Sequence, residues 1–408
     1  MALVLAVTGC TAPASPGGSA APTAVVQTAS AVPADVVVPA GAPAALEFPE
    51  VGAGAVGIAH PDGSVDVLGQ GGETGTVPIA SITKVITALV VLDAHPLADT
   101  AESLAAGTVD AGPMITLGQA DLDITAAVEA QDQFTEPMYA GQEVSLRDAL
   151  AVTLLTSANN YAESVALWAF GSQEAYLTAA RAWLAEQGLT ATTLADASGL
   201  DPGSASSTGD LLRVASIAHG NLSLASIAGL ATLDQEDLGT IANQNILLGE
   251  NGVDGLKTGS TSYAGYTLLT SAQVVVGSTP VTLVSVVLGT PSIDARFSTT
   301  RALLASAQAG LREVPLVSDG QVPGRYTFPG DGEAGAESHT AATPLEAVAS
   351  TALSAVVFGD APVTTTISLD DLTATGEVLS AAIGDAVGTA TFATSSGVHT
   401  VPLVLAEA

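Results

Sequence analysis

The sequence predicts an α+β fold followed by a small all-β domain at the C-terminal end. Between residues 46 and 312, apolar runs typical of strands are interspersed with amphipathic segments of helical period. From residue 313 onward, short strands separated by turn residues replace the helices. The first 45 residues are rich in Ala, Pro, Thr, Ser and Gly, as in a flexible tether. We therefore expect a signal and tether over 1–45, a domain of mixed helices and strands over 46–312 and a β-rich domain over 313–408.

The middle segment is expected to begin with a β-hairpin and to continue mainly with helices. Pro61-Asp62-Gly63 is a turn signal between two apolar segments. Apolar residues three and four apart predict the helices, and Ser207 is placed to cap one of them. The expected helices span 81–92, 146–155, 161–170, 174–187, 207–219 and 299–311, and the expected strands span 53–60, 64–68, 266–276 and 281–288. Residues 101–140 lack a clear period and are expected to be partly irregular.

The C-terminal segment has the pattern of a small β domain. Short apolar runs at 356–357, 363–367, 388–392 and 398–405 predict its strands. Glycine and proline punctuate the segment, and residues 330–343 are expected to form a flexible loop or hinge.

The charge of the chain excludes two classes of partner. Forty-one acidic residues against nine basic ones give a formal net charge of −32. Nucleic-acid binding and adhesion to anionic lipid both need a basic surface, so neither is expected. The five histidines lack the spacing of metal ligands, and we expect no metal and no cofactor.

Cys10 is the only cysteine, so the chain has no internal disulfide. It follows Val7-Thr8-Gly9 at the end of an apolar run, which resembles a bacterial lipoprotein signal in which the cysteine is lipidated. The alternative is an ordinary signal peptide with an incidental cysteine. Both interpretations place the protein outside the cytoplasm, in the cell envelope, and the first anchors it to the membrane by lipid.

The chain contains only two lysines, and each lies in a short motif. Lys84 closes Ser81-Ile82-Thr83-Lys84, Lys257 opens Lys257-Thr258-Gly259, and Ser157-Ala158-Asn159 lies between them. The order S-x-x-K, S-x-N, K-T-G is typical of active-site serine enzymes that react with penicillin or its peptide analogue. Each motif alone is common, but their conjunction with the only two lysines predicts a single site.

The first motif predicts a nucleophile with its base. Ser81 and Lys84 are three residues apart, so on a helix they share one face and the amine can take the hydroxyl proton. Lys84 must then be partly neutral. Burial would lower its pKa, and so would a second cation, for which Lys257 is the candidate.

The other motifs predict the groups around the reacting carbonyl. Ser157 could relay a proton, and Asn159 offers an amide to a substrate carbonyl. The backbone N–H groups of Ser81 and Ser260 would form an oxyanion hole. Gly259 would let its strand approach the substrate closely. Glu163, one turn after Asn159, is expected to face solvent.

Several stretches of the chain resemble the D-alanyl-D-alanine carboxypeptidases, the low-molecular-mass penicillin-binding proteins. The similar stretches are Pro78–Leu89, Leu154–Asn160, Ser198–Asp201 and Val253–Thr261. The resemblance covers residues 46–312, with a weaker one in the tail. It implies a β-lactamase-like serine transpeptidase fold, peptidoglycan stem peptides as substrates and β-lactam antibiotics as covalent inhibitors.

The resemblance also implies roles for individual residues. It places Arg296 at the terminal carboxylate of the substrate. It assigns substrate binding to the third motif and the residues after it, namely Thr258, Gly259, Ser260 and Thr261. One departure is Ala-Asn-Asn after Thr156 and Ser157, where many relatives have Gly-Asn-Asp, and this leaves the local hydrogen bonding open.

The function expected is that of a serine D,D-carboxypeptidase, which removes a terminal D-alanine through an acyl-enzyme on Ser81. A close variant is D,D-endopeptidase activity on cross-links. A β-lactamase is a second alternative, although the Glu-x-x-Leu-Asn motif of class A enzymes is absent. The third is a non-catalytic wall-binding or β-lactam-sensing lipoprotein.

Overall fold

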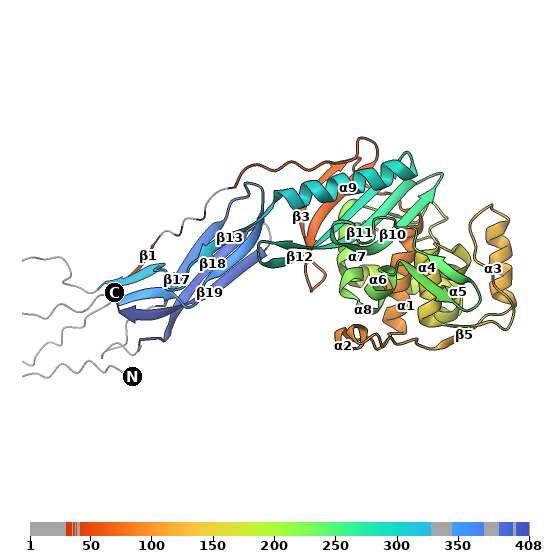
Figure 1. Ribbon diagram of the computed structural model, residues 1–408, viewed down its shortest axis with the longest axis horizontal. Coiled ribbons are helices and arrows are strands. Elements are labelled where there is room, and N and C mark those ends of the chain that lie inside the picture. The colour runs from red at the N-terminus through yellow and green to blue at the C-terminus, as the bar shows by residue number, and fades with distance from the viewer. Residues whose placement is uncertain are drawn as a thin grey trace, which may run out of the picture. The chain divides into compact units, whose positions relative to one another are not determined.

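The computed structural model describes residues 30–34, 36, 38, 41–327, 345–370, 383–394 and 397–407 (Figure 1). The chain separates into two compact units. Residues Pro43–Leu311 form the larger unit. The smaller unit combines the chain from Arg312 onward with the described residues before Pro43. Cys10 and the loop predicted at 330–343 lie outside the described residues.

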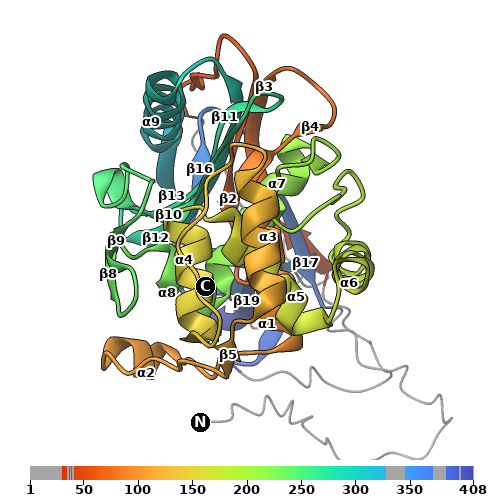
Figure 2. The same ribbon diagram turned by 90° about the vertical axis from the view of Figure 1, so that its right-hand side faces the viewer.

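The larger unit is built on a five-stranded antiparallel sheet in the order β10-β11-β12-β2-β3. The strands are β2 (Ala53–Ala59), β3 (Val65–Gly72), β10 (Val253–Thr261), β11 (Gly265–Val276) and β12 (Thr279–Thr290). Figure 2 shows α9 (Ile293–Gly310) on one side of this sheet and α7 (Thr208–Gly220) on the other. Both faces of the central strand β12 are thereby covered, and six consecutive residues of it, Leu283–Leu288, are buried.

The larger unit contains further helices beside α7 and α9. They are α1 (Thr83–Ala94), α2 (Ala101–Ala105), α3 (Gln119–Glu129), α4 (Leu146–Leu155), α5 (Asn159–Phe170), α6 (Gln173–Glu186) and α8 (Leu222–Ala228), with short 3₁₀ helices η1 (Ala80–Ile82) and η2 (Glu250–Gly252). Three short pairs of strands complete the unit: β4 (Val77–Pro78) with β7 (Ala205–Ser206), β5 (Met114–Thr116) with β6 (Glu143–Ser145), and β8 (Thr232–Gln235) with β9 (Gly239–Ala242). The first ten residues of α1 are all buried, so this helix is the central one of the group.

The helix ends follow local capping chemistry. Ser207 caps α7 as predicted, because its side chain accepts a hydrogen bond from the N–H of Asp210. Helix α9 begins six residues earlier than predicted, since Ser292 caps it by accepting from the N–H of Ala295. Residues 101–140, predicted as partly irregular, contain α2, β5 and α3.

The smaller unit is all β, as predicted for the C-terminal domain. Its six-stranded sheet has the order β1-β14-β15-β19-β18-β17, and β13 pairs with β16 beside it. These strands are β1 (Ser30–Pro33), β13 (Leu311–Val317), β14 (Gly324–Thr327), β15 (Leu345–Ala349), β16 (Leu353–Phe358), β17 (Thr364–Leu369), β18 (Ala386–Thr394) and β19 (Gly397–Glu407). One apolar core, which includes Leu316, Val357, Phe392 and Leu403, joins the two sheets.

Strand β1 lies inside the segment predicted to be a flexible tether. Ser30–Pro33 pairs with Gly324–Thr327 of β14. The prediction is wrong for these four residues, because their backbone groups find hydrogen-bond partners in a sheet edge that composition cannot reveal.

No single described helix is long and apolar enough to cross a membrane. The bent pair α7 and α8 passes that test together, by length and composition only. Leu211, Leu212 and Val214 of α7 are buried in the protein core.

Candidate active site

Ser81 lies in the short helix η1, immediately before α1. The turn that presents it is strained, because Ala80 has a φ of 48°, in the left-handed region. Gly199 packs directly against this turn. Its own φ is 83°, and a Cβ there would lie 1.9 Å from the carbonyl oxygen of Ala80. Only glycine fits at that position, and this lets the loop that contains Gly199 pack directly against the turn that carries Ser81.

Lys84 lies one helical turn after Ser81, as the spacing predicted. Its side chain is fully buried. Its Nζ donates to Ser81 Oγ at 2.8 Å, to Asn159 Oδ1 at 2.7 Å and to the Ser198 carbonyl at 2.7 Å. Burial lowers the pKa of Lys84 to about 7, although the charges of Asp196 and Glu163 oppose that shift. An amine with this pKa is neutral in a substantial fraction of molecules at pH 7, which a general base requires.

The second motif lies where α4 ends and α5 begins. The carbonyl of Phe134 accepts from Asn159 twice, from Nδ2 at 2.8 Å and from the backbone N–H at 3.3 Å. Ser157 is partly exposed with a φ of 68°. Its hydroxyl has no hydrogen-bond partner among the described residues, so the structure shows no contact for the proton relay predicted for Ser157. Asn159, by contrast, does contact Lys84.

Asn160 accounts for the departure from Gly-Asn-Asp. It is fully buried, and its Nδ2 donates to the carbonyl of Glu136 at 2.7 Å and to Thr125 Oγ1 at 3.1 Å. Its Oδ1 accepts from the N–H of Glu136 at 3.1 Å. The side-chain amide therefore ties the loop before the motif to α3 and α5. An aspartate could not donate the first two bonds.

Lys257 lies on β10 and is 1% exposed, yet its Nζ has no hydrogen-bond partner among the described residues. Burial, then Lys84, then Arg296 lower the pKa of Lys257 well below its ordinary value. Burial and the charge of Lys257 were both predicted to lower the pKa of Lys84; burial does so, and Lys257 does not contribute. The physical reason is that Lys257 is itself driven toward its neutral form, and a neutral amine exerts little repulsion.

The third motif brings an edge strand against the serine. Strand β10 is the outermost strand of its sheet. A Cβ on Gly259 would lie 3.0 Å from the backbone nitrogen of Ser81 and 2.5 Å from Thr267 Oγ1. Ser260, by contrast, is exposed at the outer edge. This close approach places the backbone of the third motif beside the backbone of Ser81, as an oxyanion hole shared by Ser81 and Ser260 requires.

Two threonines of the third motif hold neighbouring segments. Thr258 Oγ1 donates to Gln244 Oε1 at 3.3 Å, and Gln244 in turn donates to the carbonyl of Thr156 at 2.6 Å. Thr261 Oγ1 accepts from the N–H of Ala264 at 3.0 Å and thereby shapes the turn after β10. Thr258 thus couples the third motif to the end of α4, where the second motif begins.

Arg296 extends from the first turn of α9 toward the same strand. Its guanidinium donates to the carbonyl of Gly259 at 3.3 Å and lies 4.4 Å from the ring centre of Phe297. Burial lowers the pKa of Arg296 to about 10, so it keeps its positive charge at neutral pH. Its Nε has no partner among the described residues.

Comparison with known proteins agrees with this geometry. A family model described as D-alanyl-D-alanine carboxypeptidase matches residues 46–292. The chain belongs to this family. The match includes all three motifs, and the fold is that of the penicillin-binding proteins, as predicted.

Three similar proteins illustrate the relationship. D-alanyl-D-alanine carboxypeptidase DacC of Escherichia coli K12 is 29% identical over 246 residues, which are 58% of this chain and 57% of DacC. The D-alanyl-D-alanine endopeptidase of the same organism is 28% identical over 220 residues, or 51% of this chain and 62% of its own. The crystal structure of penicillin binding protein 5 from Haemophilus influenzae superposes with a TM-score of 0.58 at 20% identity, over 88% of this chain and 97% of that one. The matches span about three fifths of the lengths of the two curated relatives.

In this member of the family, two carboxylates near the lysine were not identified from the sequence. Asp196 is 7% exposed and lies in the loop that supplies the Ser198 carbonyl. Glu163 was expected to face solvent, but it is half-buried and accepts from the N–H of Ala197 at 3.2 Å. Burial raises the pKa of Glu163, and the charge of Asp196 raises it further. The spacing of Glu163 four residues after Asn159, on the same helix face, is the sequence signal that could have identified this position.

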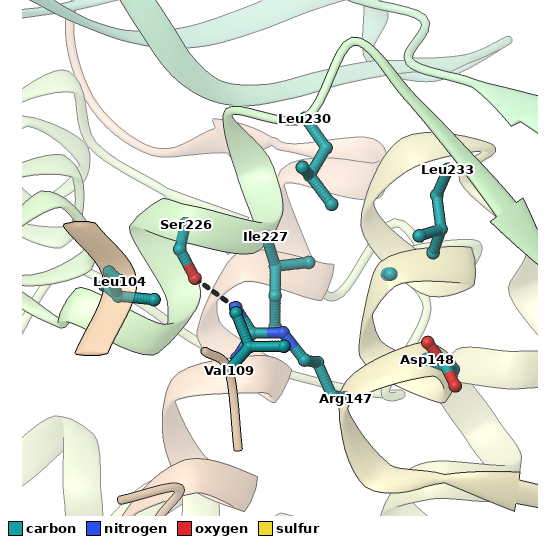
Figure 3. Close-up of a pocket in the computed structure, with 9 residues that line it drawn as sticks. Leu104, Val109, Arg147, Asp148, Ser226, Ile227, Leu230 and Leu233 are labelled. Carbon is teal, nitrogen blue, oxygen red and sulfur yellow. Dashed lines mark hydrogen bonds between the residues drawn. The ribbon is translucent and has the colours of Figure 1, made fainter. Parts of the chain in front are cut away.

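A separate cavity of about 360 Å³ lies away from the motifs (Figure 3). Its walls are mostly apolar and come from α2, α4, α8 and β8, with Leu104, Ile227, Leu230 and Leu233 among them. The charge of Arg147 in the wall is neutralised by Asp99 at 2.6 Å. None of the residues with a role in the proposed chemistry lines it. Within the described chain, no cluster of three or more His, Cys, Asp or Glu residues could hold a metal ion.

Proposed function

We propose that the protein is a serine D,D-carboxypeptidase that removes the terminal D-alanine from peptidoglycan stem peptides. The observation that carries this proposal is the 2.8 Å contact between Ser81 Oγ and a buried lysine amine whose pKa is about 7. A nucleophile and a base in one helical turn can form an ester without a histidine.

In the acylation step, neutral Lys84 takes the proton of Ser81 as Oγ attacks the carbonyl between the two D-alanines. The backbone N–H groups of Ser81 and Ser260 stabilise the negative oxygen that forms. The C–N bond then breaks, and the leaving amine receives the proton from Lys84, directly or through Ser157. The products of this step are free D-alanine and an ester on Ser81.

Water completes the cycle. Lys84, neutral again, takes a proton from the water that attacks the ester carbonyl, and the C–O bond to Ser81 breaks. Lys84 returns its proton to Ser81 Oγ, and the shortened peptide leaves with a new carboxyl group, which loses its own proton to the solvent. No atom or electron beyond those of the peptide and water is needed.

The substrate is proposed to bind as an extended strand beside β10. An edge strand has unpaired backbone groups that can pair with a peptide. Thr258, Gly259, Ser260 and Thr261 line this edge. The Asn159 amide would hold a substrate carbonyl, and Arg296 the terminal carboxylate. Lys257 has no partner of its own among the described residues, and a substrate carboxylate would favour its charged form.

The test is covalent labelling with a fluorescent penicillin, followed by its release over time. A penicillin-binding protein gives a slowly released adduct of one penicillin per chain, and Ser81→Ala gives none while it stays folded. Rapid release indicates a β-lactamase, and an absent adduct on the wild-type protein indicates a non-catalytic binding protein. An adduct that persists in Ser81→Ala would exclude this serine as the nucleophile.

The D,D-endopeptidase activity is a second candidate, because one of the similar proteins is named for it. The two reactions use the same chemistry and differ in the leaving group, which is free D-alanine in one and a cross-linked peptide in the other. Incubation with a pentapeptide monomer and with a cross-linked dimer separates them. Release of D-alanine from the monomer supports the carboxypeptidase, and cleavage of the dimer alone supports the endopeptidase.

We propose further that the protein acts in the cell envelope and is anchored there by lipid on Cys10. The apolar run before Cys10 and the Ala- and Pro-rich stretch after it support this proposal. Several acyl chains would hold a protein firmly at a membrane. The native protein should then fractionate with membranes, and Cys10→Ser should release it or stall its processing. Secretion of the unlipidated native protein would exclude the anchor and leave the catalytic proposal intact.

A further inference from the structure

The Ser198 carbonyl is one of three acceptors that hold the Lys84 amine. It belongs to residues 196–204, a segment with no helix or strand. A carbonyl in such a segment stays in place only if other groups fix the backbone around it. The Lys84 amine must keep its position while it gains and loses a proton. The groups that fix this segment therefore also help to position Lys84.

Asp196 accepts most of the hydrogen bonds that fix the segment after Ser198. Its carboxylate accepts from the backbone N–H groups of Gly199, Leu200 and Asp201 at 2.8, 2.8 and 3.1 Å, and from the hydroxyls of Ser198 and Ser204 at 2.8 and 2.7 Å. An ionised carboxylate has only acceptor sites and suits this set of five donors. The three residues after Ser198 are thereby held as one tight loop around a buried charge.

Two helices hold the peptide just before Ser198. The Ala197 N–H donates to Glu163 Oε1 on α5 at 3.2 Å, and the Ala197 carbonyl accepts from Thr87 Oγ1 on α1 at 2.7 Å. These are the helices that carry Asn159 and Lys84. The segment is therefore fixed to the same elements as the groups that it helps to align.

The two carboxylates also act on Lys84 through their charge. Asp196 faces the amine from the loop and Glu163 faces it from α5, and both favour its protonated form. Lys257 faces it from β10. Tyr176 of α6, whose pKa is raised by burial and by the charges of Glu163 and Asp196, stays neutral. Burial lowers the pKa of Lys84 and the carboxylates raise it, and their balance sets the pH above which the amine can accept a proton.

We propose that Asp196 and Glu163 are positioning residues. Asp196 holds the Ser198 carbonyl in place to accept the hydrogen bond from the Lys84 amine. Both carboxylates set the pH at which that amine becomes a base for Ser81. The inference rests on the proposed function, because it assumes that Lys84 activates Ser81. Neither carboxylate is proposed to touch substrate. The negative charges of this pair favour protonated Lys84, so that the amine becomes neutral near physiological pH and not far below it.

The experiment measures the second-order rate of acylation by a fluorescent penicillin between pH 5.5 and 9. The wild-type rate should rise with pH through a midpoint near 7, since only neutral Lys84 accepts the proton. Glu163→Gln keeps an acceptor for Ala197 but removes a charge that favours protonation. Its midpoint should therefore move to lower pH, by about half a pH unit or more.

Asp196→Asn should shift the midpoint in the same direction and also lower the plateau rate at least about tenfold, because its amide N–H₂ must face donors that now lack an acceptor. The matched control is Asp201→Asn in the same loop. Asp201 is exposed and accepts from the N–H of Gly203 at 2.8 Å, so its profile should match the wild type.

The outcomes are distinguishable. A Glu163→Gln midpoint that stays in place or moves to higher pH overturns the inference, even if labelling is normal. A midpoint shift of the same size in Asp201→Asn overturns it as well, because the effect would then be nonspecific. A wild-type protein that reacts with penicillin at no pH overturns the proposed function instead.

Discussion

Lys84 and Lys257 are equally buried but differ in their hydrogen bonds. Lys84 donates to three acceptors, which offset the cost of placing an amine in the core. Lys257 has no partner among the described residues. Its burial is a cost to stability that the fold tolerates, as is typical of side chains retained for function. The two positions therefore predict opposite responses to removal of the amine.

Replacement of Lys257 by methionine should stabilise the fold and remove activity. Methionine has a similar length and no polar group to desolvate, so the free energy of unfolding should rise by about 1–3 kcal/mol. Acylation by penicillin should fall by at least about tenfold. Urea denaturation and fluorescent labelling measure the two effects. Lys257→Arg is the control: it keeps a charged group in the core and should not gain stability. A destabilised Lys257→Met protein would show that the amine has a structural role.

Arg296 is expected to discriminate between a free carboxylate and an amide at the end of the peptide. A charge-assisted contact contributes about 1.5–3 kcal/mol, so Arg296→Ala should lower kcat/KM on free-carboxylate peptides by about ten- to a hundredfold. The matching peptide amides lack the charge and should be affected much less. Steady-state kinetics on both series measure this difference. Equal losses on both would mean that Arg296 acts only by packing against Gly259 and Phe297.

At the scale of elements, the site depends on three segments meeting with almost no space between them. Helix η1 carries the serine, β10 passes in front of it, and the loop 196–204 braces it from behind. Glycine makes both contacts possible, at Gly259 in front and at Gly199 behind. Motif spacing predicts which residues meet, but these distances arise only from the packing of elements distant in sequence.

Gly199→Ala should therefore damage both the fold and the site. Its φ of 83° and the clash with the Ala80 carbonyl predict a loss of about 1–3 kcal/mol in the free energy of unfolding, together with slower acylation. Thermal denaturation and penicillin labelling measure the two effects. Gly209→Ala in α7 is the control, because the nearest atom to its new Cβ would lie 3.7 Å away. That variant should be neutral or stabilised by up to about 1 kcal/mol. Equal behaviour of the two variants would contradict the close contact.

At the scale of the whole molecule, charge is the dominant feature. A formal net charge of −32 on 408 residues means that repulsion between surface carboxylates opposes the folded state. The ion pairs of the described chain that salt could weaken are few, for example Arg301 with Glu250 at 2.8 Å and Arg325 with Glu346 at 3.0 Å. Screening should consequently relieve more repulsion than it removes attraction.

The melting temperature is therefore expected to rise with salt. The Debye length falls from about 10 Å at 0.1 M to about 3 Å at 1 M salt, so most surface repulsion is screened over that range. Thermal denaturation in sodium chloride and in potassium chloride, at equal ionic strength, should give the same increase. A melting temperature that falls with salt would mean that ion pairs outweigh the repulsion.

The sequence by itself determined the family motifs of the candidate site and the classes of element. Ser81, Lys84, Asn159 and Lys257 were identifiable because motif order is a property of the chain, and local periodicity with caps such as Ser207 predicted most helices. The boundaries differ where a cap such as Ser292 begins a helix before its apolar period becomes clear.

Only the tertiary structure decided how the two lysines divide their electrostatic roles. Burial, and not Lys257, lowers the pKa of Lys84, and desolvation depends on what all other elements cover. The same holds for Asp196 and Glu163, which reach the site through loop and helix packing, and for β1, whose partner strand is nearly 300 residues away in sequence. Each depends on long-range contacts, which no local pattern encodes.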